Sequence, residues 1–281
     1  MPRSVAVVTD STAYLERADV DRHGIVSVPL TVVVDGAPLE DGTPEAAAAL
    51  VPALRSRLAV TTSRPGPELF ARAYRAAAEA GASAVVSVHL SSEISGTWDA
   101  AVVAAERATV PVHVVDSGTI AAALGYGVLA AAEAAASGAS AEAAAEAARR
   151  RTAASRAHFY VDTLDHLRRG GRINAAQALF GSALAVKPLL EMRDGRIELR
   201  EKVRTAGRAL ARLEELVVEH AGSTEVDVAV QHLAAHDRAA ELAERLLQRL
   251  PALGRLQVGE VGAVLGAHTG PGLVGVITAP R

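Results

Sequence analysis

The amino-acid sequence predicts an α/β protein with two domains, and its length, composition and order of apolar segments support this prediction. The 281 residues are 50% hydrophobic, enough to bury a substantial core, and the length suits two modest domains. Short β-branched segments alternate with longer alanine-rich segments in the first half, a pattern typical of βαβ units around a parallel sheet. Because the pattern then changes, we expect one domain at residues 1–157 and another at 158–281.

The first domain is expected to alternate strands and helices. The predicted strands are Val5–Val8, Val28–Val34, Ala84–Leu90 and Val112–Val115, and the predicted helices are 44–57, 67–80, 96–108, 119–136 and 140–156. Helix starts are indicated by Thr43 before a proline, by Pro67 and by Ser140, and helix ends by Gly81 and Gly138. Alanine has high helix propensity but little apolar area, so these helices are expected to be scaffold.

The second domain is expected to mix antiparallel and parallel features. Asp194-Gly195 between two apolar segments predicts a β-hairpin. The predicted strands are His158–Val161, Ala185–Met192, Ile197–Val203 and Val226–Gln231, with helices at 205–220 and 237–250 and β-rich chain to the end.

Composition and charge exclude several functional classes. The net charge of −3 leaves no basic surplus for nucleic acid, and the absence of cysteine excludes disulfides and thiolate chemistry. The apolar segment Val5–Val8 is too short for a signal-peptide core, and the longest apolar region, Ile120–Ala132, is too short to span a membrane. We therefore expect a cytoplasmic protein.

Polar clusters of serine, threonine and glycine follow several predicted strands. They are Thr9–Thr12, Thr61–Ser63, Ser91–Thr97 and Asp116–Thr119. Because the carboxyl ends of parallel strands meet at one edge of a sheet, these clusters predict a polar site. Ser95, Gly96 and Thr97 open a helix, so their backbone N–H groups and hydroxyls suit a small anion. Alternatively, Ser95 only caps the helix.

The glycine-rich tail from Gly266 to Gly275 contains a formal G-x-G-x-x-G pattern. Too little chain follows for the helix of a dinucleotide site, so these glycines are expected to allow tight turns and close backbone approach. His268, within this tail, could reach a ligand carboxylate, although a histidine beside a glycine turn is more often a structural hydrogen-bonding group.

Other motifs argue against enzymes and metal sites. The sequence has neither a G-x-S-x-G elbow nor a P-loop, so we expect no catalytic residues. His232 and His236 are four residues apart, but a strand end and a helix start need not share a face, so we expect no metal site. The basic segment from Arg168 to Arg172 fits either a solvated helix end or a docking surface.

Read together, eight short motifs resemble the DegV family along nearly the whole chain. They are Val8–Thr12, Thr62–Pro65, Ser91–Thr97, Val115–Ser117, Leu167–Ile173, Val186–Pro188, Lys202–Thr205 and Gly266–Gly272. The resemblance implies two intertwined α/β domains, a three-layer parallel-sheet domain and a mixed-sheet α/β domain. It also implies that one long-chain fatty acid is buried between them.

The resemblance further implies a lipid-binding role without turnover and without a cofactor. Such proteins present the fatty-acid carboxylate to a separate ATP-dependent kinase of the dihydroxyacetone-kinase type, which forms acyl phosphate for phospholipid synthesis. By motif, the carboxylate-binding residues are Thr61, Thr62, Ser63, Ser95, Gly96, Thr97, Arg204 and His268. Arg168, Arg169 and Arg172 are the candidates for partner docking, and transient contact with a membrane surface is a further expectation.

Two departures and two rival functions accompany this resemblance. Arg64 and Gly66 stand where the family pattern has Gln and Ser, and Trp98 replaces a usual Tyr. One rival is a serine-dependent acyl hydrolase or transferase that uses Ser95 and His268. The other is a binding protein for a phosphorylated or other small anion, since a helix N-terminus also suits phosphate. The sequence leaves open the acyl chain length and saturation, the identity of the kinase and the oligomeric state.

Overall fold

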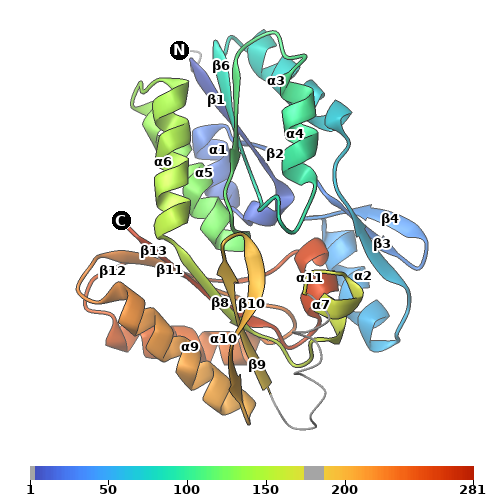
Figure 1. Cartoon of the computed structure of the whole chain (residues 1–281), viewed down its shortest axis with the longest axis vertical. Coiled ribbons are helices and arrows are strands. Elements are labelled where there is room, and N and C mark those ends of the chain that lie inside the picture. The colour runs from blue at the N-terminus through green and yellow to red at the C-terminus, as the bar shows by residue number, and fades with distance from the viewer. Residues whose placement is uncertain (1–3, 174–186) are drawn as a thin grey trace. The chain divides into compact units, whose positions relative to one another are not determined.

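The structure, a computed structural model, describes residues 4–173 and 187–281, and it divides the chain into two compact units (Figure 1). The first unit comprises Met1–Thr31, Glu40–Gly42 and Ser63–Ala154, and the second comprises Val32–Leu39, Thr43–Thr62 and Ser155–Arg281. The chain therefore passes between the units several times. This arrangement, with a parallel sheet in one unit and a separate mixed sheet in the other, confirms the predicted fold class.

The first unit has three layers around a parallel sheet in the order β2-β1-β6-β7. In chain order its strands are β1 (Val5–Asp10), β2 (Val26–Val28), β6 (Ala84–His89) and β7 (Val112–Asp116). One face packs against α3 (Pro67–Glu79) and α4 (Thr97–Ala105), as Figure 1 shows. The other packs against α5 (Ala121–Ala136) and α6 (Ala141–Ala154), with α1 (Arg17–His23) beside α5, and the short 3-10 helix η1 (Ser11–Ala13) follows β1.

The second unit is built on a six-stranded mixed sheet in the order β10-β9-β8-β13-β11-β12. Only β11 and β12 pair in parallel; the other neighbours are antiparallel. The strands are β8 (Arg156–Tyr160), β9 (Lys187–Arg193), β10 (Arg196–Val203), β11 (Val226–His232), β12 (Leu253–Glu260) and β13 (Val274–Pro280). The helices α9 (Ala206–Ala221) and α10 (His236–Arg249) pack on this sheet through a core that includes Leu213, Leu242 and Leu246.

Smaller elements complete the second unit. The strands β3 (Thr31–Val34), β4 (Ala37–Glu40) and β5 (Val60–Ser63) form a sheet in the order β4-β3-β5. The helix α11 (Ala263–Thr269) contacts both α2 (Pro44–Arg55) and α7 (Asp165–Arg169). A Cβ atom at Gly266 would lie 2.5 Å from Leu50 and 3.0 Å from Leu233, so only glycine allows α11 to approach α2 this closely.

Most of the predicted elements are present, and their sequence signals act as expected. Thr43 accepts a hydrogen bond from the Ala46 N–H at the start of α2, and Pro67 opens α3. Asp194 and Gly195 both have positive φ, at 48° and 79°, in the hairpin between β9 and β10. Residues 185–186, in the predicted strand Ala185–Met192, lie outside the described residues.

The division of the chain differs from the predicted one. The sequence placed residues 32–39 and 43–62 in the first domain, whereas the structure groups them with the second. The reason is a long-range contact, because α2 packs against α11, which lies about two hundred residues later. The tail also contains α11, where the sequence predicted only β-rich chain.

None of the helices in the described ranges 4–173 and 187–281 has both the length and the apolar character that a membrane span requires.

Candidate functional site

The centre of the candidate site is a hydrogen bond between Thr62 and His268, both in the second unit. Thr62 lies on β5 and His268 near the end of α11, and Thr62 Oγ1 is 2.8 Å from His268 Nε2. In a neutral imidazole one ring nitrogen donates and the other accepts. When Nε2 donates to Thr62, the threonine O–H remains free to donate to another acceptor. The pair can therefore present a hydroxyl donor to a carboxylate.

The imidazole of His268 is held in place by a glycine of the basic segment. A Cβ atom at Gly170 would overlap Nδ1 and lie 2.9 Å from Cε1 of the ring. Gly170 directly follows α7, so the close packing of α7 and α11 brings its backbone against the imidazole. A side chain at position 170 would force the ring to move. Gly170 is therefore required for the position of the His268 ring.

His268 is neutral at physiological pH. Burial, together with the positive charge of Arg172, lowers the pKa of His268 from 6.5 to about 4. The site therefore offers a neutral hydrogen-bonding imidazole with a guanidinium near it. Arg172 itself donates a hydrogen bond to the Gly170 carbonyl, so its charge is anchored beside this segment.

A second cluster of hydroxyls, in the first unit, opens α4. Ser95 Oγ lies 2.9 Å from Thr97 Oγ1 and accepts a hydrogen bond from the Thr97 N–H. The N-cap of α4 is Gly96 and no side chain caps this helix, so the alternative in which Ser95 is the cap is wrong, and its contact with the Thr97 N–H is a local turn just before the helix. The hydrogen bond between the two hydroxyls uses only one of their two protons, so one O–H remains to donate to a ligand.

The loop that carries Ser95 is held by two carboxylates, one half-buried and one fully buried. Asp116 accepts a hydrogen bond from the Ser92 hydroxyl at 2.5 Å and from the Gly118 N–H at 2.9 Å. Asp10, which is fully buried, accepts from the Leu90 N–H at 3.1 Å. These contacts explain why polar residues follow the strand ends, since they fix the backbone just before the hydroxyl cluster.

Arg64, which departs from the family pattern, lies against the same cluster. Its guanidinium donates to the Gly96 carbonyl at 3.2 Å, and a Cβ atom at Gly96 would overlap it. Gly96 is therefore required for this contact. The substitution adds a positive charge directly beside the predicted carboxylate-binding residues Ser95–Thr97.

The remaining predicted residues are more exposed. Thr61 and Ser63 are exposed neighbours of Thr62 on β5. Arg204 is exposed just after β10, and the structure gives it no hydrogen bond to Thr62 or to His268, all three being described residues. The cation beside His268 is instead Arg172, which the sequence assigned to docking.

The docking candidates divide into two kinds. Arg168 and Arg169 are exposed at the end of α7, where Arg168 lies 3.8 Å from Asp165. Arg172 is only partly exposed and contacts the Gly170 backbone. The first two fit an accessible surface, while Arg172 belongs to the surroundings of His268.

A Ser–His–Asp arrangement exists in the first unit, but it is closed to substrate. His89 Nδ1 is 3.0 Å from Asp10, and its Nε2 is 2.7 Å from Ser87 Oγ. All three side chains are fully buried, and the Tyr74 hydroxyl covers Ser87 at 2.9 Å. Burial raises the pKa of Tyr74 to about 12. The arrangement is a buried structural network, which sequence reasoning missed because its members lie on two separate strands.

In the alternative function of a serine-dependent hydrolase, Ser95 would be the nucleophile. Within its own unit, however, Ser95 lies beside a hydroxyl group and not beside a general base. Its hydroxyl contacts Thr97, and the described contacts of the first unit pair it with no histidine. A serine needs an adjacent base to act as a nucleophile. No observation of this structure therefore favours the hydrolase.

The glycine tail behaves as the sequence predicts. Gly270 and Gly272 have positive φ, at 76° and 91°, and a Cβ atom at either would overlap a side chain, His166 in the first case and Asp162 in the second. The segment that follows Gly272 is the strand β13, so the G-x-G-x-x-G pattern does not open a helix. These glycines shape a turn.

The buried histidines predict that the protein loses stability in acid. Burial is the main cause that lowers the pKa of both His158 and His268 to about 4 from 6.5. In this interval the unfolded chain binds protons that the folded chain does not, so the free energy of unfolding should be intact above pH 6.5 and fall progressively toward pH 4. Urea denaturation across this range measures the loss. His268→Asn should make the dependence shallower, and an unchanged slope would contradict the neutral state of His268.

The fold and the site define the class of the protein: an α/β protein of two units, each with a cluster of hydrogen-bonding side chains. The DegV family matches residues 4–281. A DegV domain-containing protein of Streptomyces coelicolor is 62% identical over 281 residues, with 100% of both chains covered. The chain therefore belongs to the DegV family.

Solved structures of this family resemble the chain throughout. One is a DegV family protein from Thermus thermophilus whose structure is described as showing fatty acid binding. It has a TM-score of 0.91 to this chain and 34% sequence identity, and the match covers 99% of this chain and 100% of that protein. DegV from Bacillus subtilis, described as a fatty acid binding protein, has a TM-score of 0.90 at 33% identity, covering 99% and 100%. These likenesses extend over both units of the fold.

Proposed function

We propose that this chain binds one long-chain fatty acid and that Thr62 and His268 hold its carboxylate. The observation that carries the proposal is the 2.8 Å hydrogen bond between these two side chains, with a neutral imidazole and a hydroxyl proton available to a ligand. The fatty acid binding described for the relatives from Thermus thermophilus and Bacillus subtilis supports this choice of ligand. Arg172 supplies the nearby positive charge that a carboxylate requires.

The two ends of such a ligand have different energetic roles. Burying an acyl tail contributes about 0.8 kcal/mol per methylene, or roughly 12 kcal/mol gross for about 15 methylenes, before the cost of immobilising the ligand. A buried carboxylate without donors would be strongly unfavourable. The tail therefore supplies affinity, and the donors at Thr62 and His268 set the orientation of the head group.

Ser95, Gly96 and Thr97, with Thr61, Ser63 and Arg204, remain predictions as carboxylate contacts. Ser95 is the most informative of them, because its hydroxyl pair with Thr97 has one free donor. Ser95→Ala removes that pair and leaves the backbone of the loop held by Asp116. Reduced fatty acid affinity in this variant, with unchanged stability, would support the assignment.

We further propose that the protein presents the carboxylate to a separate ATP-dependent kinase and has no turnover of its own. The resemblance to the family implies this role in acyl-phosphate formation, and the neutral, hydrogen-bonded site is consistent with holding a substrate rather than activating one. The alternative ligand is a small anion, which would bind at the same polar groups but would have no acyl tail to bury. Fatty acid content of the purified protein separates these two readings.

Kinase engagement should depend on the exposed arginines of α7. Arg168→Glu with Arg169→Glu is expected to weaken binding to a dihydroxyacetone-kinase-type fatty acid kinase about tenfold or more, because opposed charges across an interface become like charges. Arg172 is kept unchanged, since it lies near His268. Pull-down or calorimetric titration measures the affinity, with fatty acid content as the test of folding.

The control for this docking test is the pair Arg149→Glu and Arg150→Glu on α6, two exposed arginines whose reversal changes the net charge equally. Equal loss of kinase binding in both double variants would show a general charge effect and contradict a docking role for α7.

A further inference from the structure

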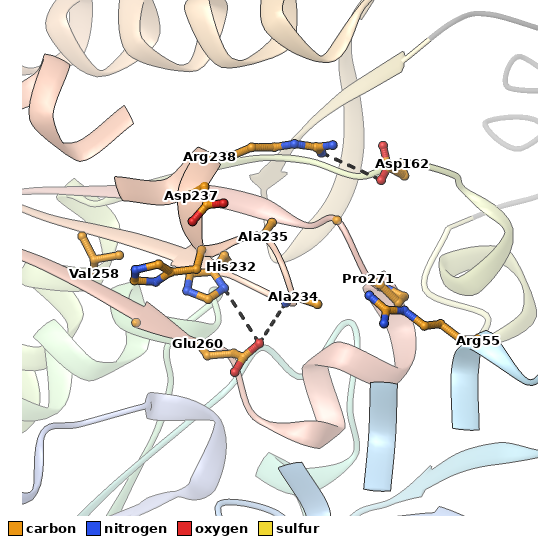
Figure 2. A pocket seen from close by; sticks show the side chains of 13 residues that line it. Arg55, Asp162, His232, Ala234, Ala235, Asp237, Arg238, Val258, Glu260 and Pro271 are labelled. Carbon is orange, nitrogen blue, oxygen red and sulfur yellow. Dashed lines mark hydrogen bonds and ion pairs between the residues drawn. The ribbon is translucent and has the colours of Figure 1, made fainter. Parts of the chain in front are cut away.

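A pocket of about 810 Å³ lies within the second unit, at the carboxyl ends of the parallel strands β11 and β12 (Figure 2). The helix α10 connects these strands, and its first turn lines the pocket together with the turn before β13. The volume falls within the range of small-molecule sites, and this edge of a sheet is where α/β proteins commonly bind ligands. Thr62 and His268 do not line it.

Several hydrogen-bond donors at this pocket lack acceptors. The N-cap of α10 is Ala235, which has no side chain able to accept from the first N–H groups of the helix. The His232 side chain is only 7% exposed, yet its Nδ1 has no hydrogen-bond partner among the described residues. Nη1 of the half-buried Arg238, in the first turn of α10, also has no hydrogen-bond partner among the described residues, and its ion pair with Asp162 is long, at 3.9 Å. Buried polar groups are seldom left unpaired, and His232 Nδ1 is a donor in the tautomer that carries its proton there, so these groups indicate a missing acceptor.

Two of the three carboxylates that line the pocket, in contrast, already accept hydrogen bonds from protein donors. Asp162 accepts from the Tyr160 hydroxyl and lies 3.3 Å from Lys187 Nζ. Glu260 accepts from the Ala234 N–H at 2.8 Å, and its 3.9 Å separation from His232 Nδ1 is too long for a hydrogen bond. Figure 2 shows these two contacts of Glu260 and the longer pairing of Arg238 with Asp162.

The ligand must therefore bring acceptors into the pocket. The lining carries a formal charge of −1, because Arg55 and Arg238 are opposed by three carboxylates, those of Asp162, Asp237 and Glu260. Lys187, outside the lining, pairs with Asp162. The preference for an anion consequently comes from free donors and from the dipole of α10 rather than from net charge. Affinity should be moderate, because Asp237 lies in the same first turn.

We propose that this pocket binds the phosphate group of a small phosphorylated metabolite at the amino end of α10. Its free donors come from a helix end, a strand end and a guanidinium, and they match the several oxygens of a phosphate better than the two of a carboxylate. The pocket volume leaves room for the organic part of a phosphomonoester. The hydroxyls of that part would find carboxylate acceptors in Asp237 and Glu260.

The test is a calorimetric titration of the full chain with inorganic phosphate, ribose 5-phosphate and ribose. Ribose 5-phosphate should bind saturably with a Kd of about 1 mM or tighter, inorganic phosphate more weakly, and ribose not at all. Ala235→Asp places a carboxylate at the amino end of α10, so it should weaken binding about tenfold or more while preserving or raising the melting temperature. Arg238→Gln should also weaken it, by removing a charged donor.

The matched control is Thr43→Asp, which adds the same charge at the N-cap of α2 in the same unit and should leave phosphate binding unchanged. Fatty acid content, measured in parallel, should be the same in all variants, so the outcome is independent of the proposed lipid function. No saturable binding of ribose 5-phosphate up to about 10 mM would overturn the proposal. So would equal affinities in Ala235→Asp and Thr43→Asp, or ribose 5-phosphate binding no tighter than inorganic phosphate.

Discussion

Replacing His268 with alanine is expected to lower acyl-phosphate formation by a partner kinase on the order of a hundredfold, while fatty acid binding survives. The loss of one hydrogen bond to a charged head group costs on the order of 1.5–3 kcal/mol, several times less than the tail contributes. Phosphoryl transfer is more demanding, because the carboxylate oxygen must be held close to in-line geometry. The substitution removes the partner of Thr62 and so loosens the orientation of the head group.

The measurement uses variants loaded with labelled fatty acid, whose occupancy is confirmed before saturating kinase and ATP are added. His220→Ala in the same unit is the control, since it removes an imidazole on α9. Arg172→Gln and Arg204→Ala then distinguish the two candidate cations, and we expect the larger effect from Arg172. Wild-type rates for His268→Ala at full occupancy would return His268 to a structural role.

Replacing Asp10 with alanine should destabilise the protein by about 3–5 kcal/mol, because it removes a buried carboxylate and leaves its several hydrogen-bond partners unsatisfied. Asp10 and His89 are both fully buried, and Asp10 also accepts hydrogen bonds from Thr12 and from the Leu90 N–H.

Urea denaturation compares Asp10→Ala with Asp21→Ala, which removes an exposed ion pair with Arg17 and should change stability by less than about 1 kcal/mol. Because Asp10 fixes the backbone before the loop that carries Ser95, the variant should also lower fatty acid affinity if Ser95 contacts the ligand. A loss of stability below about 1 kcal/mol would contradict the role of the buried network.

The parts of the fold that could be predicted are those with local signals. The βαβ units, the helix starts at Thr43 and Pro67 and the Asp194-Gly195 hairpin each depend on residues close together in the chain. The strands β2 and β12 lack such signals, because β2 has only three residues and none of the eight residues of β12 is fully buried. The assignment of α2 to the second unit depends on its contact with α11 and has no local signal.

The candidate site divides in the same way. The threonine and serine clusters and His268 could be identified by motif, but the Thr62–His268 contact joins residues 206 positions apart. The position of Arg172 beside His268 follows from packing around Gly170, which the sequence does not encode locally. The unpaired groups at the start of α10 could not be predicted. The sequence shows neither that α10 begins directly after Ala235, which cannot cap it, nor that the buried His232 lies beside this helix end.

The most direct test of the central claim is mass spectrometry of the ligand extracted under denaturing conditions from protein purified from a bacterial host. The account predicts long-chain fatty acid at close to one molecule per chain, and uptake of added oleate or palmitate by delipidated protein. Absence of fatty acid in the extract, together with no uptake of either added lipid, would contradict it.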